Sequence, residues 1–359
     1  MVAGVSGELA TALATLAPLD AKAVAAATAR QGRLVKPPGA LGQLETLSIQ
    51  LAGIAGQCPP PVPAHPAVAL FAGDHGVVAA GVTPWPQEVT AQMVAAACHG
   101  GAAVSVLCRQ FGARLVIVDV GVASALTAHP LLLDRKIGAG TADLSRGPAM
   151  HRDDVDAALD VGAAVAALLV AEGADLLVTG EMGIGNTTAA AAVIAAITGA
   201  RAEACTGRGT GINDTMLAHK TAIVAAAAQR ARAHAAVGDA RAIVADVGGF
   251  EIAALAGFVI GGAAAGVPVV LDGVITLAAA LAAEQLAPGV VARVIAGHRS
   301  VEPGASLALS ALGLDPVIDL GLRLGEASGG CLAVPIVQAA AATLGSMATF
   351  DAAAVTTIG

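Results

Sequence analysis

The chain has 359 residues and a formal net charge of −8 at pH 7, and its basic residues are scattered, which argues against a nucleic-acid-binding surface. Apolar residues make up 56% of the chain but aromatic residues only 2%, so the high hydropathy comes from small side chains. The five cysteines form no C-x-x-C pair, which indicates neither a zinc site nor a disulfide framework and favours a reducing cytoplasm.

The chain begins and ends with helical patterns and has a different rhythm between them. Residues 7–57 read as helical with a break at 36–39, and the proline-rich residues 59–66 read as a linker. Beyond the linker, short apolar runs alternate with alanine-rich segments of helical length. These runs predict buried strands at residues 68–72, 115–118, 176–179, 242–245, 267–271 and 293–296. From about residue 302 the pattern is helical again, interrupted at residues 322–330.

This alternation predicts the fold class. Runs that are apolar at every position are typical of a parallel sheet covered by helices on both faces. We therefore expect an open, Rossmann-like α/β domain over residues 61–320. The helical segments 1–60 and 321–359 are expected to pack together as a small helical domain. Nearly every predicted strand is followed by polar or glycine-rich residues, so the chemistry is expected at the carboxyl edge of the sheet.

One uncharged run, residues 252–271, has roughly the 20-residue length of a membrane span. Its four glycines and Pro268 predict instead a helix followed by a buried strand. The N-terminus carries Glu8 and Asp20, where a signal peptide would need a basic start and an apolar centre. We therefore expect no association with a membrane.

The most informative motif is GEMGIGNTT at residues 180–188, which joins a predicted strand to a predicted helix. Glycines let the backbone approach a ligand, and the following helix N-terminus favours a phosphate or carboxylate. Glu181 is unusual there, because a carboxylate must repel an anion, bind a sugar hydroxyl or move a proton. A plain strand-to-helix turn remains the alternative.

A second glycine cluster, GRGTG at residues 207–211, precedes a helix that carries Lys220. Glycines followed by a lysine suggest another phosphate contact, with a solvated helix face as the alternative for Lys220. Neither cluster is a P-loop or a dinucleotide fingerprint, which disfavours a nucleoside triphosphatase or a dehydrogenase.

Two further loops carry candidate residues. Asp74 and His75 follow the first predicted strand, but no partner at metal-ligand spacing follows, so they are expected to organise a strand-end loop and no metal is predicted. Trp85, the only tryptophan, lies between two prolines and either covers a core edge or lines a pocket for a flat ligand.

Glu326 is the second unusual carboxylate, because it stands in the glycine-rich loop GEASGG at residues 325–330. A glutamate held there out of bulk water would have a raised pKa and could accept a proton near neutral pH. An ordinary surface glutamate is the alternative.

Taken in order, these motifs resemble those of the nicotinate-nucleotide dimethylbenzimidazole phosphoribosyltransferase family along nearly the whole chain. The matching segments are residues 36–42, 73–77, 180–188, 207–211, 248–251, 271–273, 297–304 and 322–326. Where the family usually reads G-E-G-T-G-A in the last loop, this chain has Ala327, Ser328 and Gly330, so it keeps the glutamate and differs at three positions after it.

The resemblance implies transfer of ribose 5-phosphate from nicotinate mononucleotide to 5,6-dimethylbenzimidazole, with inversion, giving α-ribazole 5′-phosphate and nicotinate in cobalamin biosynthesis. It implies no cofactor, no metal, small-molecule substrates only, and a cytoplasmic homodimer. A different base acceptor, or a non-catalytic relative that binds a benzimidazole or nucleotide, remains the alternative.

The resemblance also implies roles for individual residues. Glu326 would be the general base and Glu181 a second carboxylate near the reacting groups. The ribose and phosphate would be held by Gly183, Gly185, Asn186, Thr187, Gly207, Gly209, Lys220, Asp272, Gly273 and Ser300. The acceptor base would lie against Thr83, Trp85, Glu88, Gln92 and Leu324.

Overall fold

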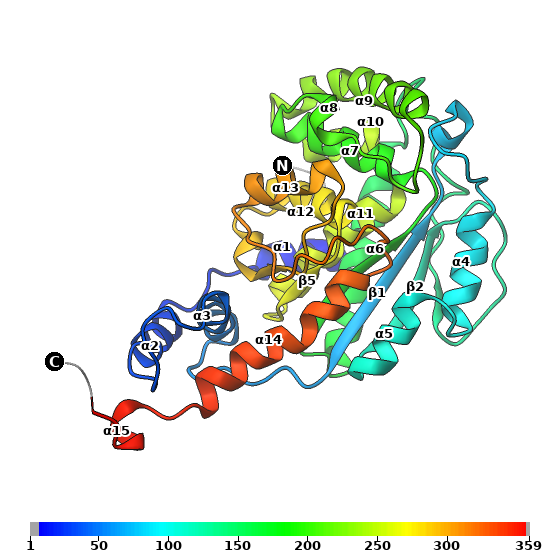
Figure 1. Ribbon diagram of the computed structural model, residues 1–359. Helices are drawn as coiled ribbons and strands as arrows, with labels where there is room; N and C mark the ends of the chain where they lie inside the picture. Colours follow the sequence, from blue (N-terminus) through cyan, green and yellow to red (C-terminus); the bar gives the residue numbers. More distant parts are fainter. Residues whose placement is uncertain (1–6, 357–359) are drawn as a thin grey trace.

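The computed structural model describes residues 7–356, and its centre is a six-stranded, all-parallel sheet of order β3-β2-β1-β4-β5-β6 (Figure 1). The strands are β1 (Pro66–Gly73), β2 (Arg114–Gly121), β3 (Leu132–Asp134), β4 (Leu176–Met182), β5 (Val269–Leu271) and β6 (Val294–Ala296). This confirms the predicted open α/β fold.

Helices cover both faces of this sheet, as β1 illustrates. Ala67, Ala69 and Phe71 point into a core shared with α6 (Arg152–Ala171), α11 (Phe250–Ala264) and α12 (Val274–Leu286). The alternate residues Val68, Leu70 and Ala72 point into a second core shared with α4 (Val89–Cys98), α5 (Ala103–Phe111) and α14 (Ser328–Ser346). Because successive strand residues point to opposite faces and both faces are apolar, the strand reads as a continuous apolar run.

The helical elements fill the connections between strands. They are α1 (Glu8–Thr15), α2 (Ala21–Gln31), α3 (Gln43–Ala55), η1 (Gly76–Ala80), α4 (Val89–Cys98), α5 (Ala103–Phe111), α6 (Arg152–Ala171), α7 (Asn186–Thr198), α8 (Ala202–Cys205), α9 (Asp214–Ala235), α10 (Ala240–Val247), α11 (Phe250–Ala264), α12 (Val274–Leu286), η2 (Val290–Arg293), α13 (Pro303–Leu312), α14 (Ser328–Ser346) and α15 (Phe350–Ala353).

One predicted strand is wrong and one strand was missed. Residues 242–245 lie in α10, where the Asp239 side chain accepts a hydrogen bond from the N–H of Ala242 and caps the helix. Ile243, Val244 and Val247 are buried at helical spacing, so the short apolar run belongs to a helix face. The missed strand, β3, has three residues at the sheet edge, too few to show a pattern.

The uncharged run at residues 252–271 divides into α11 and β5, as predicted. Two other segments are long and apolar enough to cross a membrane by length and composition, Val89–Phe111 and Ser328–Ser346. The first is interrupted at residues 99–102 into α4 and α5, and the second is α14, which packs on the sheet and on α5. The fold thus accounts for both apolar segments as packed helices.

Helices α6 and α11 approach unusually closely. A Cβ atom on Gly162 would lie 1.8 Å from the carbonyl oxygen of Ala254, and one on Gly257 would lie 1.9 Å from that of Leu159. Both positions therefore require glycine for the helix backbones to touch.

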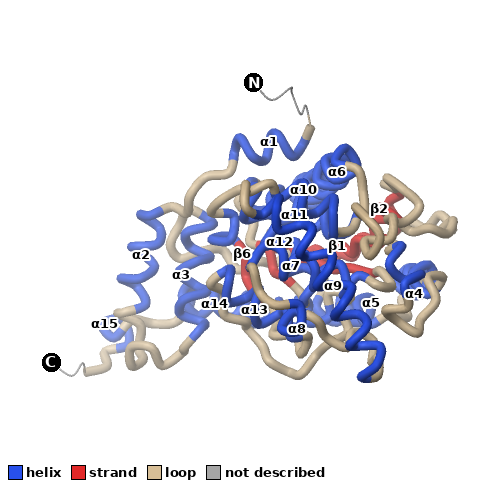
Figure 2. Tube along the Cα trace, turned by 90° about the horizontal axis from the view of Figure 1, so that it is seen from above, coloured by secondary structure: helices blue, strands red, loops and turns tan. Residues whose placement is uncertain are grey.

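Helices α2 and α3 from the N-terminal part of the chain lie beside α15 at one end of the molecule, outside the sheet (Figures 1 and 2). Ala27, Leu34, Ala52 and Leu344 form a small core there, and Arg30 donates to the carbonyl oxygens of residues 344 and 345. Helix α1 packs instead against α6 and α11. The domain boundaries at residues 60 and 320 stay a prediction.

Candidate active site

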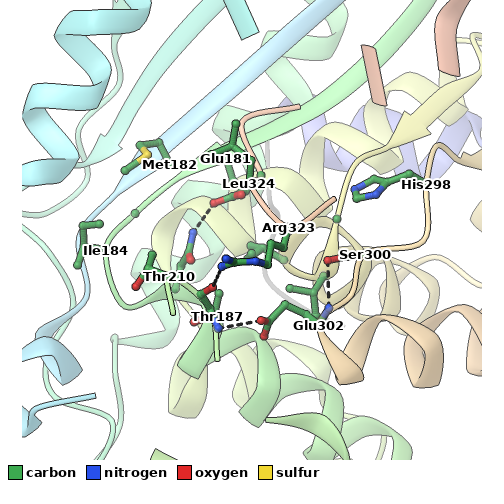
Figure 3. A pocket seen from close by; sticks show the side chains of 17 residues that line it. Glu181, Met182, Ile184, Thr187, Thr210, His298, Ser300, Glu302, Arg323 and Leu324 are labelled. Carbon is green, nitrogen blue, oxygen red and sulfur yellow. Dashed lines mark hydrogen bonds between the residues drawn. The ribbon is translucent and has the colours of Figure 1, made fainter. Parts of the chain in front are cut away.

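A cavity of about 90 Å³ opens at the carboxyl edge of the sheet. It is lined by five segments that are far apart in the sequence (Figure 3), namely residues 181–187, 209–210, 273–275, 298–302 and 323–325. Of the predicted site residues, those that line it are Glu181, Gly183, Asn186, Thr187, Gly209, Gly273, Ser300 and Leu324.

Glu181 lies near the end of β4 and is almost fully buried. Its Oε2 accepts a hydrogen bond from the side-chain amide of Asn186. Burial, reinforced by the carboxylates of Asp272, Glu251 and Glu326, raises the pKa of Glu181 to about 8, against the opposing effect of Asn186. Near neutral pH this side chain therefore carries its proton and can donate a hydrogen bond into the cavity.

The turn after Glu181 is held tightly against β1. A Cβ on Gly183 would lie 2.2 Å from the carbonyl oxygen of Gly73, and Gly185 has φ +94°, so both need glycine. Helix α7 begins at Asn186, directly after this turn, and Asn186 and Thr187 line the cavity. The N–H groups of Asn186 and Thr188 donate to the carbonyl oxygens of Gly183 and Gly185, so the turn is tied to the first turn of the helix, whose positive dipole end lies at the cavity wall.

Lys220 is buried on α9, so the solvated-face alternative for this residue is wrong. Its Nζ donates to Thr187 Oγ1 at 2.8 Å and to the carbonyl oxygen of Gly207 at 3.1 Å. Burial lowers the pKa of Lys220 to about 8, and the nearby Glu302 carboxylate opposes that shift. Lys220 therefore ties the two glycine motifs together from behind the cavity wall.

Asp272 follows β5 and holds the start of α14. Its Oδ1 accepts from the N–H groups of Gly329 at 2.7 Å and Gly330 at 3.0 Å, and His298 Nε2 lies 3.5 Å away. Burial raises the pKa of Asp272, while His298 and these amides oppose the shift. Asp272 thus fixes the first turn of α14, directly after the loop at residues 325–327, and the neighbouring Gly273 forms part of the cavity wall.

Glu326 stands in that loop with its backbone at φ +56°, a left-handed conformation rare for glutamate. Its side chain is buried, and Oε2 has no hydrogen-bond partner within residues 7–356. Burial raises the pKa of Glu326, whereas the backbone N–H groups of Val104 and Ala103 at the start of α5 lower it. Strained backbone around a buried acid is typical of a functional site, so the surface-glutamate alternative is wrong.

The predicted acceptor residues lie at different distances from the cavity. Thr83 Oγ1 lies 3.5 Å from Thr210 Oγ1 on the cavity wall, and it accepts from the N–H of Trp85. The Trp85 side chain is 48% exposed, so it does not cover a core edge. Glu88 precedes α4, and Gln92 lines a separate cavity between α4 and residues 125–132.

His75 and Glu251 form a fully buried pair beside this site, with 2.6 Å between Nε2 and Oε1. Asp74 accepts from the N–H of Ala123 at 2.8 Å. Asp74 and His75 therefore organise the loop at the end of β1, as predicted. In the part of the chain that the structure describes, no group of three or more His, Cys, Asp and Glu side chains is arranged to hold a metal ion.

Two charged residues of the cavity wall, Glu302 and Arg323, were not predicted as site residues. Glu302 accepts from the N–H of Gly209 through Oε1 at 2.7 Å, and Arg323 donates to the carbonyl oxygen of Gly209 at 3.0 Å. Both stand inside motifs that had been singled out, at residues 297–304 and 322–326. A charged side chain inside a glycine-containing motif is the feature of the sequence that could have identified each of them.

These features, a parallel α/β sheet with phosphate-type turns and buried carboxylates at its carboxyl edge, fit a transferase of phosphorylated sugars. A family model described as phosphoribosyltransferase matches residues 16–355. The curated nicotinate-nucleotide–dimethylbenzimidazole phosphoribosyltransferase of Salinispora tropica is 51% identical and covers 95% of this chain and 97% of its own length. That of a Roseiflexus species is 50% identical, with coverage of 97% and 98%.

Solved structures agree with these relatives. The crystal structure of CobT from Thermus thermophilus is similar with a TM-score of 0.90 and 46% identity, and it covers 93% of this chain and 99% of its own. The chain therefore belongs to the nicotinate-nucleotide–dimethylbenzimidazole phosphoribosyltransferase family, which confirms the resemblance inferred from its motifs.

Proposed function

We propose that this protein transfers ribose 5-phosphate from nicotinate mononucleotide to 5,6-dimethylbenzimidazole, giving α-ribazole 5′-phosphate and nicotinate in cobalamin biosynthesis. The observation that carries the proposal is the pair of buried carboxylates, Glu181 and Glu326, next to glycine turns that Lys220 ties together. The names and identities of the relatives support the same reaction.

In this reaction the phosphate end of the nucleotide is bound first by backbone N–H groups and by charge. We assign these contacts to the turn at Gly183 and Gly185 and to the start of α7, and the ammonium of Lys220 supplies positive charge from behind the cavity wall. The residues that we assign to ribose and phosphate are Gly183, Gly185, Asn186, Thr187, Gly207, Gly209, Lys220, Asp272, Gly273 and Ser300. Fixing both ends of the sugar phosphate orients its anomeric carbon toward the incoming base.

At the anomeric carbon, the unprotonated nitrogen of benzimidazole attacks from the face opposite nicotinate. The bond from C1′ to the nicotinate nitrogen breaks, and its electron pair returns to the pyridinium ring, which is already a cationic leaving group and needs no metal. The proton on the other benzimidazole nitrogen passes to Glu326. Glu181, which holds its own proton near pH 7, positions the reacting groups by donating a hydrogen bond.

We assign the acceptor base to the wall formed by Thr83, Trp85, Glu88, Gln92 and Leu324. Thr83 and Leu324 support this assignment because both adjoin the cavity. We further propose that the enzyme acts in the cytoplasm as a homodimer on small molecules alone. The segments 1–60 and 321–359 would form its small domain.

Incubation with nicotinate mononucleotide and a panel of bases tests this proposal, with free nicotinate and the new nucleotide measured by chromatography. We expect nicotinate release that depends on dimethylbenzimidazole. Release with another base alone would indicate a different acceptor. No release with any base, together with saturable binding of the nucleotide, would indicate a binding protein and contradict the proposal.

A further inference from the structure

Glu302 presents a carboxylate on the cavity wall beside Gly207 and Gly209. The side chain is only 7% exposed and lines the cavity wall, on the opposite side from Glu181 in Figure 3. One oxygen, Oε1, accepts from the N–H of Gly209 at 2.7 Å. The other, Oε2, lies against Gly207, where a Cβ atom would come within 2.1 Å of it. No donor from residues 7–356 forms a hydrogen bond with Oε2.

The short loop at residues 207–209 is held at both of its ends. Lys220 donates to the carbonyl oxygen of Gly207, and Glu302 accepts from the N–H of Gly209. The opposite charges of Lys220 and Glu302 therefore brace the same short segment of backbone. This bracing uses one carboxylate oxygen and leaves the other available to a ligand.

The chemistry of the nucleotide restricts what Oε2 can bind. A carboxylate only accepts hydrogen bonds, so its partner must be a donor. In nicotinate mononucleotide the phosphate and the nicotinate carboxylate are acceptors, and the donors are the 2′ and 3′ hydroxyls of ribose. A phosphate placed directly against Glu302 would bring like charges together. A ribose hydroxyl is the group on this substrate that complements Oε2.

We propose that Glu302 recognises the ribose, accepting a hydrogen bond from the 2′ or 3′ hydroxyl through Oε2 and so selecting ribonucleotides over deoxyribonucleotides. This assignment rests on the function proposed above and adds the residue that reads the sugar. Ser300 supports the geometry, because its Oγ accepts from the backbone N–H of Glu302 and holds the start of α13 against the cavity.

The test combines removal of a hydroxyl group from the substrate with removal of the Glu302 carboxylate from the protein. Nicotinate mononucleotide and its 2′-deoxy and 3′-deoxy counterparts are compared by kcat/KM for nicotinate release and by calorimetric Kd. The proteins are the parent, Glu302→Gln and, as a matched control at the same loop, Lys220→Gln. Glutamine can still accept from Gly209 through its oxygen, but it replaces the charged acceptor Oε2 with a neutral amide, which can form only a weaker, reversed hydrogen bond to a hydroxyl oxygen.

The parent should discriminate against at least one deoxy nucleotide by about 10- to 100-fold, the value of a hydrogen bond to a charged group. In Glu302→Gln the kcat/KM for the ribonucleotide should fall by a similar factor. The ratio of kcat/KM between the ribonucleotide and the deoxy nucleotide should then be within a few-fold of one. Lys220→Gln should weaken all three nucleotides alike and keep the ratio. The KM for dimethylbenzimidazole should not respond to Glu302→Gln.

An unchanged discrimination ratio in Glu302→Gln, or a parent that accepts both deoxy nucleotides as well as the ribonucleotide, would overturn the assignment. The parent measurement needs no variant, so it stands even if Glu302→Gln does not fold. A parent that binds the nucleotides with this selectivity but releases no nicotinate with any base would contradict the proposed reaction and leave the role of Glu302 intact.

Discussion

Glu181 and Glu326 are two buried glutamates at one edge of the sheet, and their surroundings differ. Burial raises the pKa of each. At Glu181 neighbouring carboxylates reinforce that shift and Asn186 opposes it, whereas at Glu326 the N–H groups at the start of α5 oppose it and the carboxylate of Asp272 reinforces it. The comparison teaches that packing gives two residues of one type different electrostatic surroundings, and it supports the proposed roles, in which Glu181 holds a proton and Glu326 accepts one.

The largest effect should come from removing the proton acceptor. Glu326→Gln keeps the size of the side chain but cannot accept the benzimidazole proton, so turnover should fall by about 10² to 10⁴. The Kd for the nucleotide should be preserved. Glu203→Gln, an exposed change on α8, serves as the control. Turnover within a few-fold of the parent in a normally folded Glu326→Gln would reverse the assignment of roles.

A substitution at Lys220 should leave Glu181 and Glu326 in place, and it should weaken binding of the nucleotide more than it slows turnover. Lys220→Ala removes a buried ammonium that reaches the loop at Gly207, so the KM for the nucleotide should rise by about 10- to 100-fold. The KM for the base should barely move. Steady-state kinetics with each substrate varied in turn measure both, and an unaltered nucleotide KM would remove Lys220 from the phosphate site.

The proton on Glu181 should also appear in the stability of the fold. The pKa of this group rises from 4.5 to about 8 on folding, so its stabilising contribution is present below pH 4.5 and is lost as the pH rises to 8. Glu181→Gln should therefore unfold with a free energy about 1 to 3 kcal/mol higher than the parent at pH 8. The difference should vanish near pH 4.5.

Urea denaturation at the two pH values measures that difference, and an equal effect at both would show that the carboxyl does not hold a proton. The same variant should lose less turnover than Glu326→Gln. The double variant should be non-additive if the two side chains act as a unit.

The effect of pH alone should be graded. Lys220 loses its charge and Glu181 its proton as the pH rises through about 8, so kcat/KM for the nucleotide should decline above that value, by about tenfold per unit for each group. In Glu181→Gln the decline should be shallower, because one of the two groups is gone. A flat profile from pH 7 to 10 would contradict both pKa directions.

The smallest signal concerns the acceptor wall, which neither glutamate forms. Trp85 is the only tryptophan and is half-exposed, so its emission reports on one place alone. Titration with dimethylbenzimidazole should change that emission saturably, with Glu326→Gln giving the same curve as the parent. Absence of any saturable change would place the indole away from the acceptor.

Local motifs could be predicted from the sequence, and long-range placements could not. The turn at residues 180–188 follows from glycine spacing within nine residues, and its position between β4 and α7 was predicted correctly. The burial of Lys220 depends on α9 lying behind both glycine motifs, which no local pattern encodes. Residues 242–245 were misassigned because four apolar residues fit a strand and a helix face equally well.

The role of Glu302 was missed for a related reason. Its hydrogen bond joins residues 93 positions apart, and only the fold brings them together. Glu326 was predicted because an acid among glycines is conspicuous, yet the N–H groups of α5 that favour its charge come from more than two hundred residues away. The sequence indicates which residues are unusual, and the packing of distant segments determines their burial, their hydrogen bonds and the direction of their pKa shifts.

The contact between α6 and α11 has a consequence for how this chain can vary. Every single-nucleotide change that replaces a glycine adds at least a methyl group, and neither Gly162 nor Gly257 has room for one. No single-nucleotide change in either glycine codon gives a different residue that lets the two helix backbones stay in contact. These two positions, which do not line the cavity, should therefore be as intolerant of random mutation as the glutamates, and for a purely steric reason.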